Sequence, residues 1–399
     1  MRILLVLASL NPVDGGPPES MRTLSRAFMR LGHDVEIVTL DDPGAGWLGD
    51  LDCPVTAVGP GRFGKYRYAP AYKTWLQCRA IDFDIVVVNG VYQYHSFATR
   101  AVLRRLGRPY VAFTHGALDP WFRRRYPLKH LKKWLYWPWA DYRVLRDAAR
   151  VLFTTDEERL LARQSYWLYR ADEEVVGYGT ESPPPASPAH AAGLWARFPQ
   201  LKDRRFLLFL SRIDPKKGCD VLIRAFARVA DLDPSLLLVM AGPDSAGWRA
   251  SLEVLAAAEG IAERIIWTGM LGGNDKWAAL RAADAFVLTS HTENFGIVVV
   301  EALACGTPVL ISERVNIWRE IADAGAGLVA TDREDASASM IRKWLSLAPD
   351  RVAEVRAAAT RLFHSRYEIG GVARIILAAL ERAAASQSRT HFTGDRTDH

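Results

Sequence analysis

Two glutamates with seven residues between them, Glu293 and Glu301, are the most informative acidic pair in the sequence. Glu293 follows an apolar run that ends at Ser290, and Gly296 permits a tight turn into a short helix that would contain Glu301. The pattern therefore predicts one carboxylate in the loop after a strand and the other within a helix. Because the neighbours of Glu301 in the sequence are all apolar, we expect this carboxylate to be buried and partnered rather than solvated.

The residues between the two glutamates supply a second kind of group. Asn294, Phe295 and Gly296 would lie at the N-terminus of the short helix. The first backbone N–H groups of a helix have no acceptor within it, so they form a ready binding site for an anion such as a diphosphate.

Basic residues follow the first strand expected in the second half of the chain. Arg212 and Lys217 come after the apolar run at 205–211, and Gly218 opens the next helical pattern. Arginine forks two phosphate oxygens and lysine adds a point charge, so this loop suits a strongly negative ligand. An ordinary charged surface loop explains the same spacing equally well.

Together these motifs resemble the retaining glycosyltransferases of family 4, which have the GT-B fold. The motifs are S-R-x4-K-G after the first strand, Glu-x7-Glu, and the sequence EALACGTPVL at 301–310. In the first half, VVVNGVYQYHSFATRAV and YVAFTHGALDPW look like members that build bacterial exopolysaccharide or O-antigen. The second half carries most of the resemblance.

The resemblance implies how the second half would bind a nucleoside-diphosphate sugar. Arg212 and Lys217 would hold the diphosphate of the donor. Glu293 would bind hydroxyl groups of the donor sugar, and Glu301 would bind the ribose of the nucleotide. The backbone between the two glutamates would donate hydrogen bonds to phosphate and sugar.

The resemblance also implies residues in the first half. His115 follows the strand expected at 109–114 and matches the active-site histidine of the family. A single histidine at a strand end would otherwise more often be structural. Gly15 and Gly16, after the first strand, would let the backbone approach the sugar phosphate.

The chemistry implied by the resemblance is transfer with retention and without a metal ion. No Asp-x-Asp pair stands at the carboxyl end of an expected strand, and two cations with helix N–H groups would stabilise the departing diphosphate instead. We therefore expect a metal-independent hexosyltransferase with no cofactor, in which the acceptor hydroxyl attacks from the front face. The expected acceptor is a glycan or lipid-linked glycan in cell-surface polysaccharide synthesis.

Apolar runs that alternate with helical patterns would position these residues. The expected strands are 2–7, 34–39, 84–89, 109–114, 150–155, 205–211, 236–241, 264–268, 284–290 and 307–312. Such βαβ repetition predicts an α/β protein with two doubly wound, parallel-sheet, Rossmann-like domains facing each other across a cleft.

Three successive prolines at 183–185 mark the expected division of the chain, because they cannot continue a helix or a central strand. We expect an N-terminal, acceptor-binding domain at 1–185 and a C-terminal, nucleotide-sugar-binding domain at 186–368. A helix at 369–385 is expected to cross back to the N-terminal domain. Residues 386–399 are polar enough to be disordered.

The composition is that of a folded protein, with 49% hydrophobic and 24% charged residues among 399. The four cysteines form no C-x-x-C pair, so neither a zinc site nor a disulfide framework is predicted and a reducing cytoplasm fits best. The net charge is only +6, but the segment from Arg100 to Arg150 contains thirteen Lys and Arg and only three acidic residues. This segment suits an anionic partner.

Residues 121–143 interleave cations with tryptophan and tyrosine. A short helix at 128–137 would place Leu128, Leu131, Trp134 and Leu135 on one face, and Lys129, Lys132, Lys133 and Tyr136 on another. Such a segment suits contact with the anionic inner face of the cell membrane. Packing within the first domain explains it equally well, and nucleic acid is not expected to bind.

Other functions remain open for a doubly wound α/β protein. A nicotinamide dehydrogenase is disfavoured because residues 14–18, DGGPP, do not form G-x-G-x-x-G. A nucleotide-sugar epimerase of the same fold is a closer alternative. A glycan-binding or membrane-binding subunit without turnover is the non-enzymatic alternative.

Overall fold

The structure is a computed structural model that describes residues 1–14, 16–49, 51–121, 127–244 and 247–392. The chain forms two compact units. The first unit comprises Met1–Tyr178 and the final helix, which begins at Ile369, and the second comprises Gly179–Glu368.

The described part of the first unit contains one parallel sheet with the strand order β3-β2-β1-β4-β5-β6-β7. Its strands are β1 (Arg2–Leu7), β2 (Asp34–Thr39), β3 (Val55–Ala57), β4 (Ile85–Asn89), β5 (Tyr110–Phe113), β6 (Arg150–Phe153) and β7 (Glu173–Val175). Its helices include α1 (Gly16–Arg30), α2 (Pro70–Arg79), α3 (Tyr94–Arg105), α5 (Pro127–Tyr136), α6 (Asp141–Asp147), α7 (Asp156–Ala162) and α16 (Ile369–Phe392).

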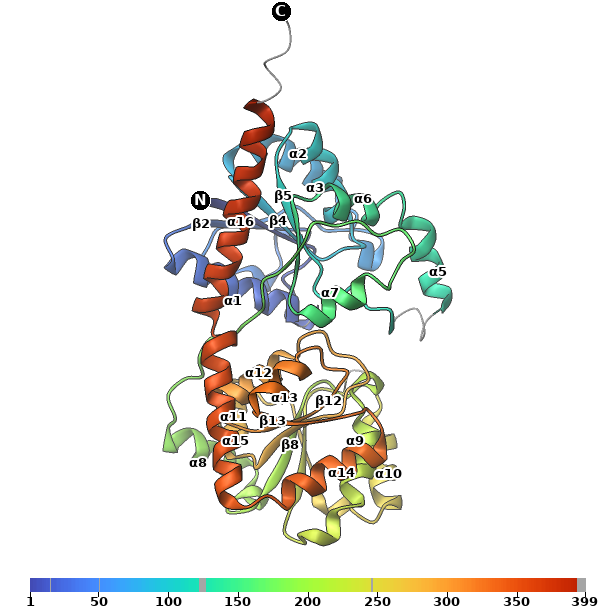
Figure 1. Ribbon diagram of the computed structural model, residues 1–399, viewed down its shortest axis with the longest axis vertical. Coiled ribbons are helices and arrows are strands. Elements are labelled where there is room, and N and C mark those ends of the chain that lie inside the picture. Colours follow the sequence, from blue (N-terminus) through green and yellow to red (C-terminus); the bar gives the residue numbers. More distant parts are fainter. Residues whose placement is uncertain (15, 50, 122–126, 245–246, 393–399) are drawn as a thin grey trace, which may run out of the picture. The chain divides into compact units, whose positions relative to one another are not determined.

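Both faces of this sheet are buried, as its apolar strands require. Ile3 and Leu5 of β1 belong to a hydrophobic cluster with α1 and α16, whereas Leu4 and Val6 belong to a second cluster with α2 and α3. Figure 1 shows α1 and α16 on one side of the sheet and α2, α3 and α6 on the other. The last helix of the chain therefore belongs to the core of the first unit.

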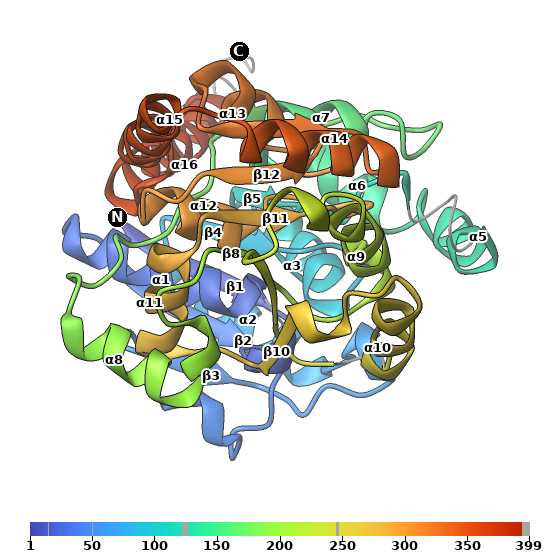
Figure 2. The same ribbon diagram turned by 90° about the horizontal axis from the view of Figure 1, so that it is seen from below.

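The second unit repeats the design with the strand order β10-β9-β8-β11-β12-β13, again parallel. Its strands are β8 (Phe206–Leu210), β9 (Leu237–Ala241), β10 (Ile265–Gly269), β11 (Ala285–Leu288), β12 (Val309–Ser312) and β13 (Gly327–Ala330). Its helices include α8 (Pro188–Arg197), α9 (Cys219–Ala227), α10 (Arg249–Ala258), α11 (Gly273–Ala282), α12 (Ile297–Ala304), α13 (Trp318–Ala324), α14 (Glu334–Leu345) and α15 (Pro349–Leu362). Helices α9, α10 and α14 gather on one side of the sheet, and α11, α12, α13 and α15 on the other (Figures 1 and 2).

The structure confirms the two parallel-sheet α/β units, and each strand expected from the sequence has a counterpart. The sequence analysis missed β3, β7 and β13, which lie at sheet edges. These strands have only three or four residues, all of them half-buried. So short a run shows too little periodicity to be distinguished from a loop.

The boundaries of the units differ from those expected. The first segment of the chain leaves its unit at Tyr178 rather than at residue 185. The proline run packs with the second unit, because Arg281 donates a hydrogen bond to the carbonyl of Pro184 and α8 packs against α11. Helix α16 continues to Phe392, past residue 385, since no proline or glycine interrupts it there.

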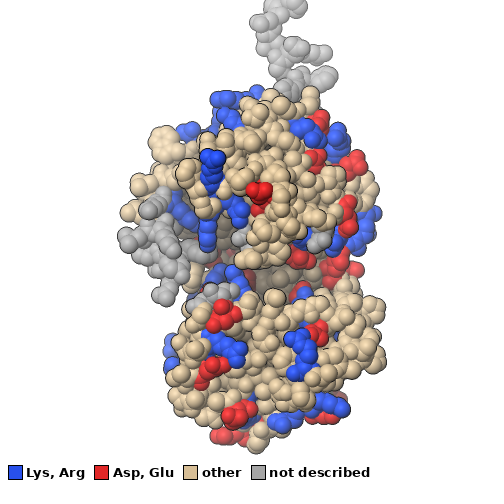
Figure 3. All heavy atoms as spheres, turned by 180° about the vertical axis from the view of Figure 1, so that it is seen from behind, with Lys and Arg blue, Asp and Glu red and all other residues tan. Residues whose placement is uncertain are grey.

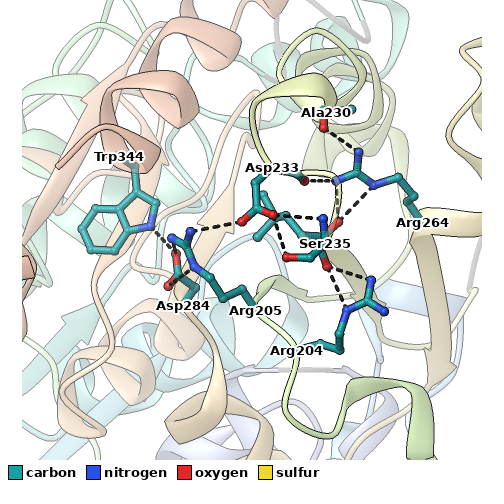
Figure 4. Close-up of polar contacts among 9 residues, drawn as sticks. Arg204, Arg205, Ala230, Asp233, Ser235, Arg264, Asp284 and Trp344 are labelled. Atoms are coloured by element: carbon teal, nitrogen blue, oxygen red, sulfur yellow. Dashed lines mark hydrogen bonds and ion pairs between the residues drawn. The ribbon is translucent and has the colours of Figure 1, made fainter. Parts of the chain in front are cut away.

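A polar network secures the amino ends of the strands in the second unit (Figure 4). Arg205, just before β8, bonds Asp233 at 3.1 Å and Asp284 at 3.0 Å. The indole nitrogen of Trp344 donates to Asp284 at 2.8 Å, and Arg264 donates to main-chain oxygens that include those of Ala230 and Asp233. Because this network lies at the amino edge of the sheet, it serves the scaffold and leaves the carboxyl edge for ligands.

Candidate active site

The second unit brings the two predicted motifs together at one edge of its sheet. The loop at 211–218 follows β8 and the loop at 289–296 follows β11, and these strands are neighbours where the strand order reverses. His291 N–H donates to the Lys216 carbonyl at 2.9 Å, so the loops are joined directly. Open α/β sheets bind ligands at such a switch point, outside the carboxyl ends of their strands.

Gly218 allows the close approach of these loops. Its φ is +65°, and a Cβ atom built on it would lie 2.2 Å from the carbonyl oxygen of Thr289. The Thr289 hydroxyl also donates to the Gly218 carbonyl at 2.8 Å. A side chain at this position would push apart the loops that carry the predicted site.

Lys217 and Glu293 form a buried ion pair across the two loops. Lys217 is 8% exposed, and its ammonium group donates to a carboxylate oxygen of Glu293. Burial alone would raise the pKa of Glu293, but the charges of Lys217, Lys216 and Arg212, with the hydrogen bond from Lys217, hold this pKa below its ordinary value. Glu293 is therefore ionised at neutral pH beside several cations.

The loop after β12 supports the backbone of Glu293. Its N–H group donates to the carbonyl of Arg314 at 2.8 Å, and its carbonyl accepts from the N–H group of Asn316 at 3.0 Å. Both main-chain groups are thus satisfied, which leaves the side chain to set the chemistry of the site.

Helix α12 begins where the sequence predicts a helix N-terminus. Gly296 has φ +73° and directly precedes the helix, whose first N–H groups have no acceptor within it. Phe295 is buried and packs edge-on against Tyr367, with 5.7 Å between ring centroids. The Asn294 side chain accepts a hydrogen bond from Asn316 at 3.4 Å. These contacts hold the turn that presents the helix N-terminus.

Glu301 is buried and partnered, as its apolar neighbours predict. It is 8% exposed, and its carboxylate lies 2.7 Å from the ammonium group of Lys276 on α11. The ammonium group also lies 4.3 Å from the ring centroid of Trp277. Lys276 was not predicted from the sequence, because no local pattern links α11 to α12.

Arg212 differs from the other charged residues of this edge. Its side chain is exposed and makes no hydrogen bond to another residue within the described ranges. Its charge still helps to lower the pKa of Glu293, so the guanidinium group faces the same region. An arginine in this state is available to an anionic ligand.

In the first unit, His115 lies just beyond the carboxyl end of β5, and Thr114 separates it from the strand. Its backbone has a left-handed φ of +48°. Its ring stacks on that of Phe113, with 4.4 Å between the ring centroids. Its Nε2 lies 3.0 Å from the side-chain oxygen of Asn89. Burial lowers the pKa of His115 to about 4, so the imidazole is neutral at physiological pH.

Glu158 holds the turn that carries His115. One carboxylate oxygen accepts from the Gly116 N–H group and from the Thr114 hydroxyl, each at 2.6 Å. The sequence analysis missed Glu158, although Thr155-x-x-Glu158 is the pattern of a capping box. Thr155 does accept from the Glu158 N–H group at 3.0 Å.

Of the two glycines expected to approach a sugar phosphate, Gly15 lies outside the described residues. Gly16 is the first residue of α1, and a Cβ atom there would meet no described atom within 4 Å. The packing of the first unit therefore does not by itself require glycine at this position.

The basic, aromatic segment splits between the core and the surface. Trp137 is fully buried and stacks on Tyr166 at 3.9 Å, whereas Leu131, Trp134 and Leu135 of α5 are 54%, 41% and 63% exposed. Helix α5 begins at Pro127 and ends at Tyr136, close to the predicted range. Arg123, Arg124 and Arg125 lie outside the described residues, as do the side chains of Leu128, Lys129, His130 and Lys132.

No group of three or more His, Cys, Asp or Glu side chains suited to a metal ion occurs among the described residues. Within the same residues, no helix is both long and apolar enough to cross a membrane.

Comparisons with known proteins agree with this arrangement. Residues 196–361 match the family described as glycosyl transferases group 1, and residues 15–179 match the glycosyl transferase 4-like domain. Each unit of the chain thus matches a different glycosyltransferase domain, and the two parallel-sheet units have the GT-B fold.

Similar proteins support the class but not the narrower expectation. A D-inositol 3-phosphate glycosyltransferase from Frankia alni is 30% identical over 269 residues, which are 63% of each protein. HepE from Anabaena, solved in complex with UDP, has a TM-score of 0.78 at 19% identity and covers 96% of this chain and all of its own. Sucrose-phosphate synthase from Thermosynechococcus elongatus has a TM-score of 0.77 at 19% identity, covering 97% of this chain and all of its own. Because the curated relatives are named for an inositol phosphate, the exopolysaccharide or O-antigen type remains a prediction.

Proposed function

We propose that this protein is a retaining glycosyltransferase that moves a sugar from a nucleoside-diphosphate sugar to an acceptor hydroxyl without a metal ion. The observation that carries the proposal is the buried Lys217–Glu293 pair, beside exposed Arg212 and the start of α12, at the switch point of the second sheet. Cations, helix N–H groups and an ionised carboxylate are the groups that a sugar diphosphate needs.

The charges of the site suit the departure of a nucleoside diphosphate. As the glycosidic bond breaks, negative charge grows on the leaving oxygen, and Arg212, Lys217 and the N–H groups of α12 stabilise it. Glu293 binds hydroxyl groups of the sugar, and Glu301 binds the ribose. His115 has a catalytic role, as the resemblance to the family implies. The acceptor attacks on the face from which the diphosphate leaves, and the diphosphate accepts its proton.

The acceptor that we propose is a glycan or lipid-linked glycan in cell-surface polysaccharide synthesis. A second candidate is an inositol phosphate, because the similar curated proteins carry that name. Transfer assays with both acceptor classes separate the two, since each product has a different mass.

We further propose a cytoplasmic protein that contacts the inner face of the membrane through α5. Two polar residues of this helix point inward, because Lys133 lies 4.0 Å from the Tyr92 ring centroid and the Tyr136 hydroxyl lies 3.2 Å from that of Tyr66. The exposed Leu131 and Trp134 are therefore left on the outer side of the helix. On the face of the second unit that Figure 3 shows, basic and acidic side chains are interspersed.

A screen of nucleotide sugars for protection against thermal unfolding tests the proposed donor site. A ligand at 100 times its dissociation constant adds roughly 2.7 kcal/mol of stability. We expect one nucleoside-diphosphate sugar to protect and then to be consumed in a donor-hydrolysis or transfer assay. Protection by a nicotinamide dinucleotide alone, epimerisation of the sugar without transfer, or binding without turnover would each contradict the proposal.

A further inference from the structure

The side chain of Asn89, at the carboxyl end of β4, has one orientation available. Asn89 is fully buried, and its side-chain nitrogen donates to the main-chain carbonyls of Val6 and Val87, each at 3.3 Å. Both partners are acceptors only, so the NH2 group must face them. The side-chain oxygen of Asn89 is thereby directed at His115.

This orientation determines which ring nitrogen of His115 carries the proton. The amide oxygen of Asn89 can only accept, and it lies 3.0 Å from Nε2 of His115. Nε2 must therefore be the protonated nitrogen. In a neutral imidazole the other nitrogen, Nδ1, is then an acceptor, and Nδ1 makes no hydrogen bond to any residue in the described ranges.

The remaining freedom of His115 is removed by its other neighbours. The ring lies nearly parallel to Phe113, at an interplanar angle of 5°. The adjacent Gly116 N–H group is held by Glu158 at 2.6 Å. Phe113 and Glu158 therefore position the ring and the backbone of His115, and Asn89 determines which ring nitrogen carries the proton.

We propose that Asn89 is a positioning residue that keeps His115 in the Nε2–H tautomer, so that Nδ1 accepts a hydrogen bond from a substrate hydroxyl group. The use of this acceptor rests on the proposed function of the site. The tautomer itself follows from the contacts of Asn89 alone, and it can be measured without any substrate.

A second buried histidine provides an internal reference. Nε2 of His95 lies 2.9 Å from the main-chain carbonyl of Asn89, which again makes Nε2 the donor. His95 is fully buried, whereas His115 is half-buried. A substitution of the Asn89 side chain leaves that carbonyl in place, so the tautomer of His95 should not change.

The test is long-range 1H–15N NMR of the whole protein labelled at its histidines, at neutral pH. Signals of His115 and His95 are assigned by their loss in His115→Gln and His95→Gln. In the wild type we expect both histidines to show a protonated Nε2 and an unprotonated Nδ1. If the wild-type spectrum showed a protonated Nδ1 on His115, that result alone would overturn the proposal.

Two substitutions then test the role of Asn89. Asn89→Leu removes the acceptor, and we expect His115 to populate both tautomers while His95 stays unchanged. Asn89→Asp keeps an acceptor facing Nε2, and His115 should retain its Nε2 proton. An unchanged tautomer in Asn89→Leu, or a change to Nδ1–H in Asn89→Asp, would refute the role of Asn89.

Activity supplies a separate readout. Asn89→Leu should lower kcat/KM for transfer at least about tenfold, and Asn89→Asp should recover part of the loss, because a wrongly placed proton removes a catalytic contact. If the tautomer behaves as expected but transfer never occurs in any variant, the proposed function fails and the role of Asn89 stands. If transfer occurs and Asn89→Leu keeps both its rate and its tautomer, the role of Asn89 fails alone.

Discussion

The ammonium group of Lys217 donates to the carboxylate of Glu293, although the two residues are 76 positions apart in the sequence. Lys217 lies in the loop after β8 and Glu293 in the loop after β11, and these loops meet because β8 and β11 are hydrogen-bonded neighbours. The lysine and the glutamate neutralise each other. Under the proposed function, a sugar diphosphate would offer a new partner to each, with phosphate for the lysine and hydroxyl groups for the glutamate.

We predict that Lys217→Ala and Arg212→Ala each lower turnover by about 100-fold or more, because each removes positive charge that stabilises the departing diphosphate. Rates are measured with saturating donor, and circular dichroism checks the fold. Arg204→Ala is the matched control, since the Arg204 guanidinium group donates to the Ser235 carbonyl at the opposite edge of the sheet (Figure 4). Near wild-type rates in Lys217→Ala or Arg212→Ala would contradict their roles.

Lys276→Met should weaken donor binding more than it slows turnover. Lys276 lies 2.7 Å from Glu301, and its loss leaves a buried carboxylate without this cation. We expect about a tenfold rise in the dissociation constant of the nucleoside diphosphate that protects best, measured by calorimetry. Lys276→Arg keeps the charge and should restore most of the affinity. Unchanged affinity in Lys276→Met would remove Glu301 from the nucleotide site.

The buried histidine His95 predicts a loss of stability in mild acid. Burial lowers its pKa to about 4, whereas an unfolded histidine has a pKa of about 6.5. Between these values only the unfolded chain binds the proton, so the free energy of unfolding falls as the pH falls, by up to about 1.4 kcal/mol per pH unit. His95→Gln should make the dependence between pH 6.5 and 4 less steep in urea unfolding, while the contribution of His115 over the same range remains. An equally steep curve in the variant would contradict this assignment.

Activity should survive excess EDTA, because two cations and the start of α12 can stabilise the diphosphate without a bridging ion. The assay compares initial rates before and after chelation, with a magnesium-dependent glycosyltransferase treated in parallel. Loss of activity that magnesium or manganese restores would show that a metal ion takes part.

Helix α5 should bind vesicles that contain anionic lipid. Leu131→Ser, Trp134→Ser and Leu135→Ser together remove the exposed apolar side chains, and co-sedimentation should fall several-fold. Neutralising several of the cations Arg123, Arg124, Arg125, Lys129 and Lys132 should weaken binding by orders of magnitude, since each is worth about 1 kcal/mol near an anionic surface. Lys133, which packs on the Tyr92 ring, is left in place. Val254→Ser, also exposed and apolar, is the control in the second unit. No binding by the wild type would mean that these residues pack within the first unit or contact the acceptor.

The sequence by itself determined the class of fold and the local motifs. Alternating apolar runs predicted two parallel sheets, because a strand buried on both faces must be apolar on both. The turn at Gly296 and the carboxylates of Glu293 and Glu301 lie within one strand, loop and helix, so their spacing was sufficient to identify them. Burial of Glu301 also followed from its immediate neighbours.

Only the tertiary structure decided the partners of these residues. Lys276 meets Glu301, Asn89 meets His115 and Glu158 holds the His115 turn because separate helices and strands are packed at shared edges. Strand order and helix packing depend on the whole core, and no short window of sequence contains them. For the same reason, the sequence could show that α5 is amphipathic, but only its contacts with the first unit show which face points outward.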